Sequence, residues 1–331
     1  MNIAVFGWYH HRNAGDDRIQ YCVTRWLDGH TLAFLPAGRP PPLHMLRTYD
    51  AVIIGGGGLI MATGGVFRNM ARWVQALGIP VALVGVSVEA ITPALRAELR
   101  AFLDVCCFAW FRDQGSLDDV GPHPRAFVAP DLTWLYPFPV LPAAGDSLAL
   151  CLRKHRTLAV EPWRQAMGTI HRPILPWPLY FEGGGDAALL KEILPQSTVP
   201  EEFTLEPLRN SRIAVSGRYH GLLFALQSGR PCVAVSSLPK TRRFLAEHGL
   251  GDWWIAEADP GDLASVLRKW ETDYERVLPQ IAALRASLAD QAQFQGQSAR
   301  DRLCDAAAAL PPPSRRWGTR ARQILDLGSY F

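Results

Sequence analysis

The chain has 331 residues, too many for one ordinary core and about right for two α/β domains. Hydrophobic residues make up 48% and charged residues 20% of it, which is a normal globular composition. The formal net charge of +3 is mild, and no motif of DNA- or RNA-binding proteins occurs, so a nucleic-acid partner is not expected.

The cysteines and the N-terminal residues indicate in which cellular compartment the protein is expected. Six scattered cysteines form no CxxC pair and lie in apolar runs, so we expect buried, reduced thiols and no metal site. The N-terminus resembles a strand rather than a signal peptide, and no apolar run approaches the ~18–20 residues of a membrane span. A cytoplasmic protein is predicted, and work at the inner face of a membrane stays open.

In the first half, short apolar runs alternate with amphipathic stretches, the pattern of parallel strands with crossover helices. Strands are expected at residues 2–7, 50–54, 80–88, 108–111 and 125–129, and helices at 18–27, 66–78 and 92–105. A stretch rich in Pro, Ala and Gly at 136–145 has no periodicity and is expected to be a linker.

The second half repeats the alternation. Strands are expected at 147–152, 173–180, 212–216, 231–236 and 253–256, and helices at 186–194, 220–228, 241–248, 262–269 and 273–308. We therefore predict an α/β protein with two Rossmann-like, doubly wound domains that face a cleft. The predicted domains are residues 1–140 and 141–309, followed by a Pro-rich and basic tail at 310–331.

Two candidate ligand-binding segments follow the first strands. Four glycines come after the strand at 50–54, and Gly56, Gly57 and Gly58 could let an anion or a ring approach backbone N–H groups. Tight packing between this strand and a glycine loop after it explains them equally well. The other segment follows the first strand and contains Asn13, Gly15 and Asp16. These residues suit either ligand contact or a turn that caps the next helix.

Cationic side chains follow several of the predicted strands. Arg112 and Arg153 each come just after a strand, where a guanidinium can bind a carboxylate or a phosphate. For Arg112 the alternative is a surface Arg–Asp pair at a helix start. Arg218 and His220 flank the start of another helix, where anions are favoured. Lys240 follows the next strand and is expected at the same edge of the sheet, with a solvated loop lysine as the alternative.

An ordered set of short motifs covers roughly residues 1 to 250. It consists of Asn13-Ala14-Gly15-Asp16, Ile54-Gly55-Gly56-Gly57-Gly58-Leu59, Phe111-Arg112-Asp113 with Ser116, Ala129-Pro130-Asp131, Leu150-Cys151-Leu152-Arg153, Ser216-Gly217-Arg218-Tyr219-His220-Gly221, and finally Ala225, Gly229, Pro231 and Lys240. In this order the motifs resemble the polysaccharide pyruvyl transferase family. The segment Arg-x-His-Gly with its downstream lysine is the most diagnostic part.

The resemblance implies a GT-B-like fold and a donor, phosphoenolpyruvate, from which a pyruvate ketal is formed on a sugar of a cell-surface polymer. It implies that His220 is the general acid and that Arg112, Arg218 and Lys240 bind the donor's phosphate and carboxylate. The residues expected to bind substrate are Asn13, Gly15, Asp16, Gly56, Gly57, Gly58, Arg153, Ser216 and Gly221. No metal and no cofactor are expected.

The sequence leaves the acceptor and two other function classes open. The acceptor could be a sugar, an oligosaccharide or a lipid-linked glycan, and peripheral membrane association and a homo-oligomer are both compatible with it. One alternative function is a GT-B-like glycosyltransferase that uses a nucleotide sugar, although no acidic residue near the end of the second domain clearly suits a ribose. The other is a non-catalytic module that binds sugars or anions.

Overall fold

The structure is a computed structural model that describes residues 1–37, 48–61, 67–68, 71, 78–142, 145–155 and 158–310. The predicted tail and most of the predicted helix at 66–78 lie outside these residues. Contacts between residues divide the chain into two compact units. The first comprises Met1–Tyr9, Gln20–Leu132 and the chain from Ala292 onward, and the second comprises His10–Ile19 and Thr133–Gln291.

The first unit contains a six-stranded parallel sheet with the strand order β2-β1-β3-β4-β5-β6. The strands are β1 (Asn2–Gly7), β2 (Thr31–Pro36), β3 (Ala51–Met61), β4 (Val81–Glu89), β5 (Phe108–Phe111) and β6 (Ala126–Val128). The helices that contribute to this unit are the second part of α1 (Ala14–Trp26), α4 (Pro93–Leu103), α5 (Gln114–Val120) and the end of α11 (Leu263–Ala308). Strand β2 was not predicted from the sequence.

Local capping explains where two of these helices begin. Pro93 occupies the first turn of α4, and the Thr92 side chain accepts a hydrogen bond from the backbone N–H of Leu95. Asp113 caps α5 in the same way by accepting from the backbone N–H of Ser116. Helix α5 packs against both β4 and α4.

The four glycines lie inside β3, so the expected glycine loop after a shorter strand is wrong. Gly56 and Gly57 have φ angles of 81° and 89°, and the pairing of β3 with β4 shifts beyond Gly57. A Cβ on Gly55 would lie 2.2 Å from the carbonyl oxygen of Val84. Glycine is therefore required by a bulge and by close strand packing in a buried sheet.

The second unit contains a five-stranded parallel sheet with the order β11-β10-β9-β7-β8. Its strands are β7 (Ser147–Cys151), β8 (Ile174–Pro176), β9 (Ser211–Ser216), β10 (Cys232–Val235) and β11 (Trp254–Ile255). Its helices are α6 (Val160–Gly168), α7 (Gly185–Ile193), α8 (Glu206–Arg209), α9 (Tyr219–Gln227), α10 (Pro239–Glu247) and the first part of α11. The class of fold, α/β with two parallel sheets, is as predicted.

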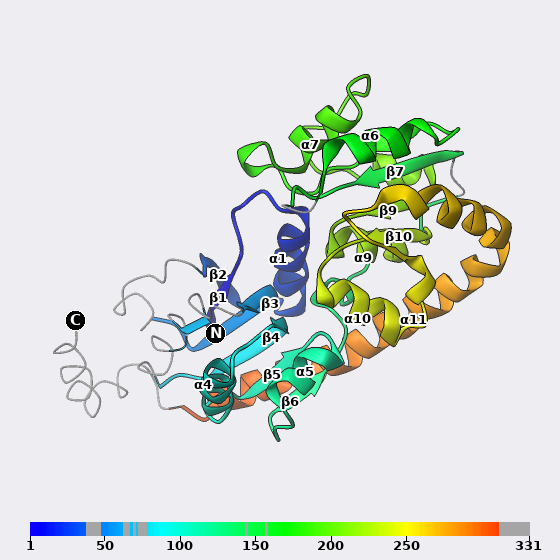
Figure 1. Cartoon of the computed structure of the whole chain (residues 1–331). Coiled ribbons are helices and arrows are strands. Elements are labelled where there is room, and N and C mark those ends of the chain that lie inside the picture. Colours follow the sequence, from blue (N-terminus) through cyan, green and yellow to red (C-terminus); the bar gives the residue numbers. More distant parts are fainter. Residues whose placement is uncertain are drawn as a thin grey trace. The chain divides into compact units, whose positions relative to one another are not determined.

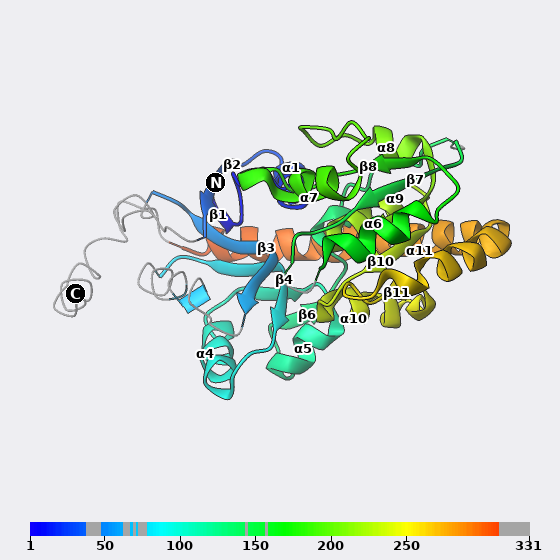
Figure 2. The same cartoon turned by 45° about the horizontal axis from the view of Figure 1, so that its top comes forward.

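Helices cover this sheet closely. Helix α9 packs on β9 and β10, as Figure 1 shows, and α6 packs against α7; Figure 2 gives a second view of these helices. Helix α6 was not predicted. The two helices expected at 262–269 and 273–308 form one 46-residue helix, α11, which contains Pro279. Short 3₁₀ turns complete the described chain: η1 (Leu132–Trp134), η2 (Glu182–Gly184), η3 (Gly251–Trp253) and η4 (Pro260–Asp262).

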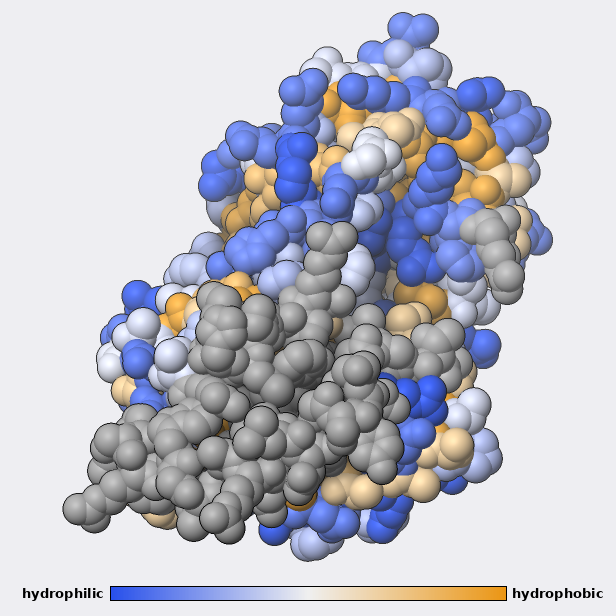
Figure 3. Space-filling model, turned by 90° about the vertical axis from the view of Figure 1, so that its left-hand side faces the viewer, coloured by the Kyte–Doolittle hydropathy of each residue, from blue (hydrophilic) through white to orange (hydrophobic). Residues whose placement is uncertain are grey.

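The hydrophilic surface and the buried cysteine thiols are those expected from a globular composition. On the face drawn in Figure 3, hydrophilic side chains cover much of the described surface, with hydrophobic residues between them. All six cysteines are free, four of them are buried, and burial raises the pKa of Cys151 and Cys232, so the prediction of buried thiols holds for most of them. Within the described residues, no helix combines the length and the apolar character needed to cross a bilayer.

Candidate active site

Most of the predicted cationic residues gather at one edge of the second unit. Strands β7, β9 and β10 are neighbours in a parallel sheet, so their carboxyl ends lie next to one another. Arg153 follows β7, Arg218 follows β9 as the N-cap of α9, and the half-buried Lys240 lies in the first turn of α10. His220 is in the first turn of α9. The sheet thus assembles three cations and an imidazole where such folds bind ligands.

The segment after β1 joins this edge rather than the sheet it follows. Residues His10–Ile19 belong to the second unit, and the backbone N–H of Ala14 donates to the carbonyl oxygen of Leu179 at 2.8 Å. Gly15 lies directly against the imidazole of His220, because a Cβ at this position would be 2.0 Å from Nδ1. The two predicted site segments around Gly15 and His220 therefore meet.

Asn13 and Asp16 lie on either side of this contact in the chain. The side-chain oxygen of Asn13 accepts a hydrogen bond from the backbone N–H of Gly15 at 3.1 Å, and Asn13 forms an isolated antiparallel bridge with Tyr180. Asp16 is buried in the first turn of α1. The turn-forming role considered for this segment is confirmed for Asn13, and contact with a substrate stays a prediction.

Replacing Gly15 by alanine is expected to displace His220 without unfolding the protein. The residue lies in a helix and its φ is not in the left-handed region, and the three atoms nearest to the added methyl group all belong to the imidazole. We expect turnover to fall by at least about tenfold, since misplacing a reacting group by 1 Å costs up to roughly 10²-fold. Gly168→Ala is the matched control, because no atom lies within 4 Å of its Cβ position. Equal turnover of the two variants would contradict the packing argument.

Arg218 is held by a buried carboxylate that the sequence did not reveal. Its Nε donates to Oδ2 of Asp186 at 2.5 Å and its Nη2 to Oδ1 at 2.6 Å. The Asp186 side chain has no exposed surface, and Oδ2 also accepts from the backbone N–H groups of Leu179 and Tyr180. Burial alone would lower the pKa of Arg218, but the hydrogen bonds and charge of Asp186 raise it. The pair occupies the Nε–Nη2 edge, so an anion would approach through Nη1.

A chain of contacts connects Arg218 through Tyr180 and Glu182 to His11 in the segment after β1. The guanidinium lies 5.0 Å from the ring centroid of Tyr180, whose hydroxyl donates to Oε2 of Glu182 at 3.1 Å. The same oxygen is 2.9 Å from Nδ1 of His11, and these two hydrogen bonds lower the pKa of Glu182. The orientation of Arg218 is therefore supported from several sides.

Ser216 and Gly221 build the turn that presents Arg218 and His220. The Ser216 hydroxyl donates to the carbonyl oxygen of Arg218 at 2.9 Å and accepts from its backbone N–H at 3.2 Å. A Cβ on Gly221 would lie 2.1 Å from the same hydroxyl oxygen, so only glycine leaves room for it. The structure accounts for both residues by local geometry, and their contact with a substrate stays a prediction.

Sequence reasoning missed an acidic residue at this edge. Glu257 follows β11 and is 2% exposed, and its Oε2 accepts a hydrogen bond from the Ser237 hydroxyl at 2.8 Å. The same oxygen lies 3.3 Å from Nδ1 of His155. The signal was its place directly after a predicted strand, which the search for a ribose-binding carboxylate passed over.

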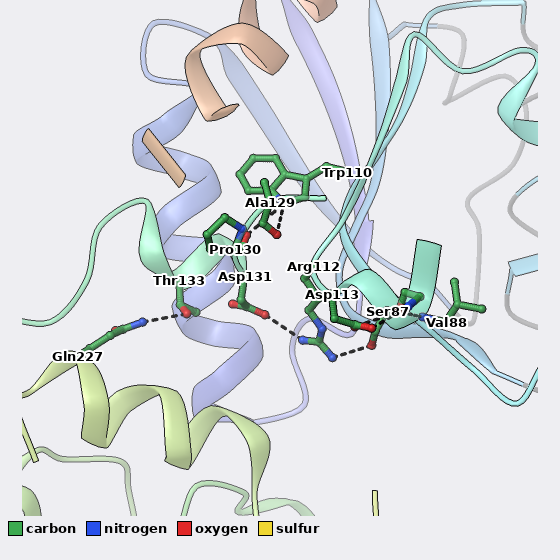
Figure 4. A network of polar contacts seen from close by, with 11 residues as sticks. Ser87, Val88, Trp110, Arg112, Asp113, Ala129, Pro130, Asp131, Thr133 and Gln227 are labelled. Carbon is green, nitrogen blue, oxygen red and sulfur yellow. Dashed lines mark hydrogen bonds and ion pairs between the residues drawn. The ribbon is translucent and has the colours of Figure 1, made fainter. Parts of the chain in front are cut away.

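In the first unit, Arg112 is buried within a network of its own (Figure 4). Its Nη1 donates to Oδ2 of Asp131 at 2.9 Å and its Nη2 to the Ser87 hydroxyl at 2.8 Å. The side chains of Arg112 and Asp131 are each 1% exposed. The alternative of a surface pair is therefore wrong, and Asp113 caps α5 instead. A contact between Arg112 and a donor stays a prediction, as do those of Gly56, Gly57 and Gly58.

Metal ligation was considered as well. Among the residues that the structure describes, no group of three or more His, Cys, Asp or Glu side chains is arranged to hold a metal ion.

Comparisons with known proteins place the chain in a fold and a family. The glycotransferase of kitacinnamycin is similar with a TM-score of 0.54 and 14% identity over 91% of this chain and 98% of that one. Anabaena Alr3699/HepE, solved with UDP and glucose, has a TM-score of 0.56 and 10% identity over 100% of both chains. A UDP-N-acetylglucosamine 2-epimerase has a TM-score of 0.51 and 11% identity over 91% of this chain and 94% of that one.

At such identities these structures show the fold alone, and the predicted GT-B-like fold is confirmed. No curated protein sequence matches the chain. A family model described as polysaccharide pyruvyl transferase matches residues 8–239, which is more than half of the chain.

Proposed function

Because this chain belongs to the polysaccharide pyruvyl transferase family, we propose that it moves the enolpyruvyl unit of phosphoenolpyruvate onto two hydroxyls of a sugar. The product is a pyruvate ketal on a cell-surface polysaccharide or its precursor, and phosphate is released. The observation that carries the proposal is the position of His220. It lies at a helix N-terminus beside Arg218 and packs against Gly15, at the edge that also holds Arg153 and Lys240.

The donor suits this edge electrostatically. Phosphoenolpyruvate carries a phosphate and a carboxylate close together, and both need cations or N–H donors when they leave water. Arg218, Lys240 and Arg153 follow three neighbouring strands, and the N-terminus of α9 adds its backbone N–H groups. Asp186 offsets part of this charge, but it also fixes the guanidinium of Arg218 in place.

The chemistry then needs a proton at the donor's methylene carbon. His220 gives a proton to C3, which produces an oxocarbenium-like centre at C2. A sugar hydroxyl adds to C2, phosphate leaves, and a second hydroxyl closes the ketal. Of the two hydroxyl protons, one balances the proton on the new methyl group and the other leaves with phosphate. Cations near the phosphate stabilise the charge that develops on it as it leaves.

Calorimetric titration with phosphoenolpyruvate tests the donor assignment. We expect saturable binding to the wild-type protein and about 10–100-fold weaker binding to Arg218→Ala, because hydrogen bonds to charged groups contribute ~1.5–3 kcal/mol. Arg218→Lys keeps the charge next to buried Asp186 and should bind with an intermediate affinity. Arg209→Ala removes an exposed arginine from α8 and serves as the control.

A panel of nucleotide sugars belongs in the same experiment. The solved structures of similar fold include glycosyltransferases, so binding of a nucleotide sugar without phosphoenolpyruvate would replace the proposal by the glycosyltransferase alternative. Binding of phosphoenolpyruvate that Arg218→Ala leaves unchanged would remove Arg218 from the donor site.

A further inference from the structure

A second imidazole lies at the carboxyl edge of the second sheet, beside a buried carboxylate. Nδ1 of His155 is 3.3 Å from Oε2 of Glu257, whose side chain is 2% exposed. The same oxygen accepts a hydrogen bond from the Ser237 hydroxyl at 2.8 Å. The main-chain carbonyl of Glu257 accepts from Nε1 of Trp163 at 3.0 Å. Glu257 is therefore held through both its side chain and its backbone.

The burial of Glu257 distinguishes this pair from another His–Glu contact in the described part of the unit, that of His11 with Glu182. Glu182, which contacts His11, has a side chain that is 51% exposed, so water screens that interaction. Transferring a carboxylate out of water costs several kcal/mol of free energy unless hydrogen bonds and an oppositely charged partner compensate for the lost hydration. In that environment Glu257 orients an imidazole more strictly than an exposed carboxylate does. The contact through Nδ1 favours the tautomer with its proton on Nδ1 and its lone pair on Nε2.

The order of the strands places His155 among the donor-binding groups. His155 follows β7, whereas Glu257 follows β11, and the sheet order is β11-β10-β9-β7. Strands β9 and β10, which precede Arg218 and Lys240, lie between β7 and β11 in the sheet, so the contact of His155 with Glu257 joins the two sides of this edge. The closeness of Arg153 to Gly217 agrees, since a Cβ on Gly217 would lie 3.1 Å from the backbone nitrogen of Arg153.

We infer that His155 is the base that takes the proton of the attacking sugar hydroxyl, and that Glu257 is its positioning residue. The inference rests on the proposed function, because ketal formation needs both a proton donor for C3 and an acceptor for the hydroxyl protons. His220 supplies the first, and His155 supplies the second. The arrangement follows the general pattern in which a buried carboxylate fixes the tautomer and orientation of a catalytic imidazole.

The oxygen of the first hydroxyl bonds to C2 while its proton passes to Nε2 of neutral His155. The C2–O bond to phosphate then breaks, and the imidazolium of His155 gives that proton to the departing phosphate. The second hydroxyl bonds to C2, and its proton passes through His155 to solvent, from which His220 regains the proton that it gave to C3.

The test compares His155→Asn, Glu257→Gln and the double variant in phosphate-release kinetics and in calorimetry with phosphoenolpyruvate. We expect His155→Asn to lower kcat by about 10²–10⁴-fold, the range for loss of a general base, with the donor Kd unchanged within about twofold. Glu257→Gln should lower kcat less. The double variant should be no slower than His155→Asn alone, because Glu257 acts through His155.

Two further measurements separate chemistry from folding. Added imidazole should restore part of the kcat of His155→Ala, which a structural role would not allow. The matched controls are His171→Asn and Glu161→Gln, exposed residues before β8 and on α6, and both should keep wild-type kcat. Thermal unfolding of each variant shows whether it is folded, and His155→Gln replaces His155→Asn if the latter is not.

Several outcomes would overturn the inference. Wild-type kcat in folded His155→Asn removes His155 as the base. If the kcat of the double variant falls by the product of the two single effects, Glu257 acts independently of His155 and is not its positioning residue. A wild-type protein that neither binds phosphoenolpyruvate nor releases phosphate refutes the proposed function itself, before any variant is compared, and the inference falls with it.

Discussion

Substituting asparagine for His220 is expected to lower kcat for pyruvyl transfer by about 10²–10⁴-fold, the usual contribution of a positioned general acid. The donor should still bind, because the proposed function assigns its phosphate and carboxylate to cations and N–H groups rather than to the imidazole. His220 stacks on Phe224 with ring centroids 6.0 Å apart, so asparagine leaves a smaller cavity than alanine would. Phosphate-release kinetics and calorimetric titration with phosphoenolpyruvate measure the two effects separately.

His248 provides the matched control for that experiment. It also packs against a phenylalanine, with its ring centroid 4.5 Å from that of Phe244, but it lies at the end of α10, away from the carboxyl edge. His248→Asn should keep the wild-type kcat. Full transfer activity in His220→Asn would refute its role as the acid, and a protein that acts as a non-catalytic module would retain its binding in both variants.

The sequence was sufficient to predict where the candidate site would form. The strand at 108–111 was predicted with its observed bounds, and the strands that carry Arg153, Arg218 and Lys240 were predicted within a few residues. Buried parallel strands have apolar runs that end abruptly in polar residues, so the positions that face ligands can be read directly. Strand β2 (Thr31–Pro36) was missed because it is only half-buried and directly follows a helix.

The partners of the charged residues could not be predicted, because they are distant in sequence. Asp186 is 32 residues before Arg218, and Glu257 is far from His155, so no local spacing connects them. The contact between Gly15 and His220 depends on a segment that belongs to a different compact unit from its sequence neighbours. Such pairings appear only when the tertiary fold is known, and the one with Asp186 decides how Arg218 is oriented.

The largest loss of stability is expected from Asp131→Ala in the first unit. The substitution leaves the guanidinium of Arg112 buried without its carboxylate, and breaking a buried ion pair from one side costs about 3–5 kcal/mol. Urea unfolding gives the change in free energy, and hydrogen exchange of the β4 and β5 amides shows whether the loss lies in this unit. Asp118→Ala, which removes an exposed partner of Gln114, should change stability by less than about 0.5 kcal/mol.

A double variant distinguishes a structural role of the Arg112–Asp131 pair from donor binding. Arg112→Met combined with Asp131→Leu removes both charges, and replacing a buried pair by apolar residues is often neutral or stabilising by ~1–4 kcal/mol. If the pair is only structural, this variant should recover the stability lost in Asp131→Ala and still bind phosphoenolpyruvate. If Arg112 also contacts the donor, the variant should be stable but bind it more weakly. An Asp131→Ala protein as stable as the wild type would contradict the buried-pair argument, because an uncompensated guanidinium cannot be accommodated there without cost.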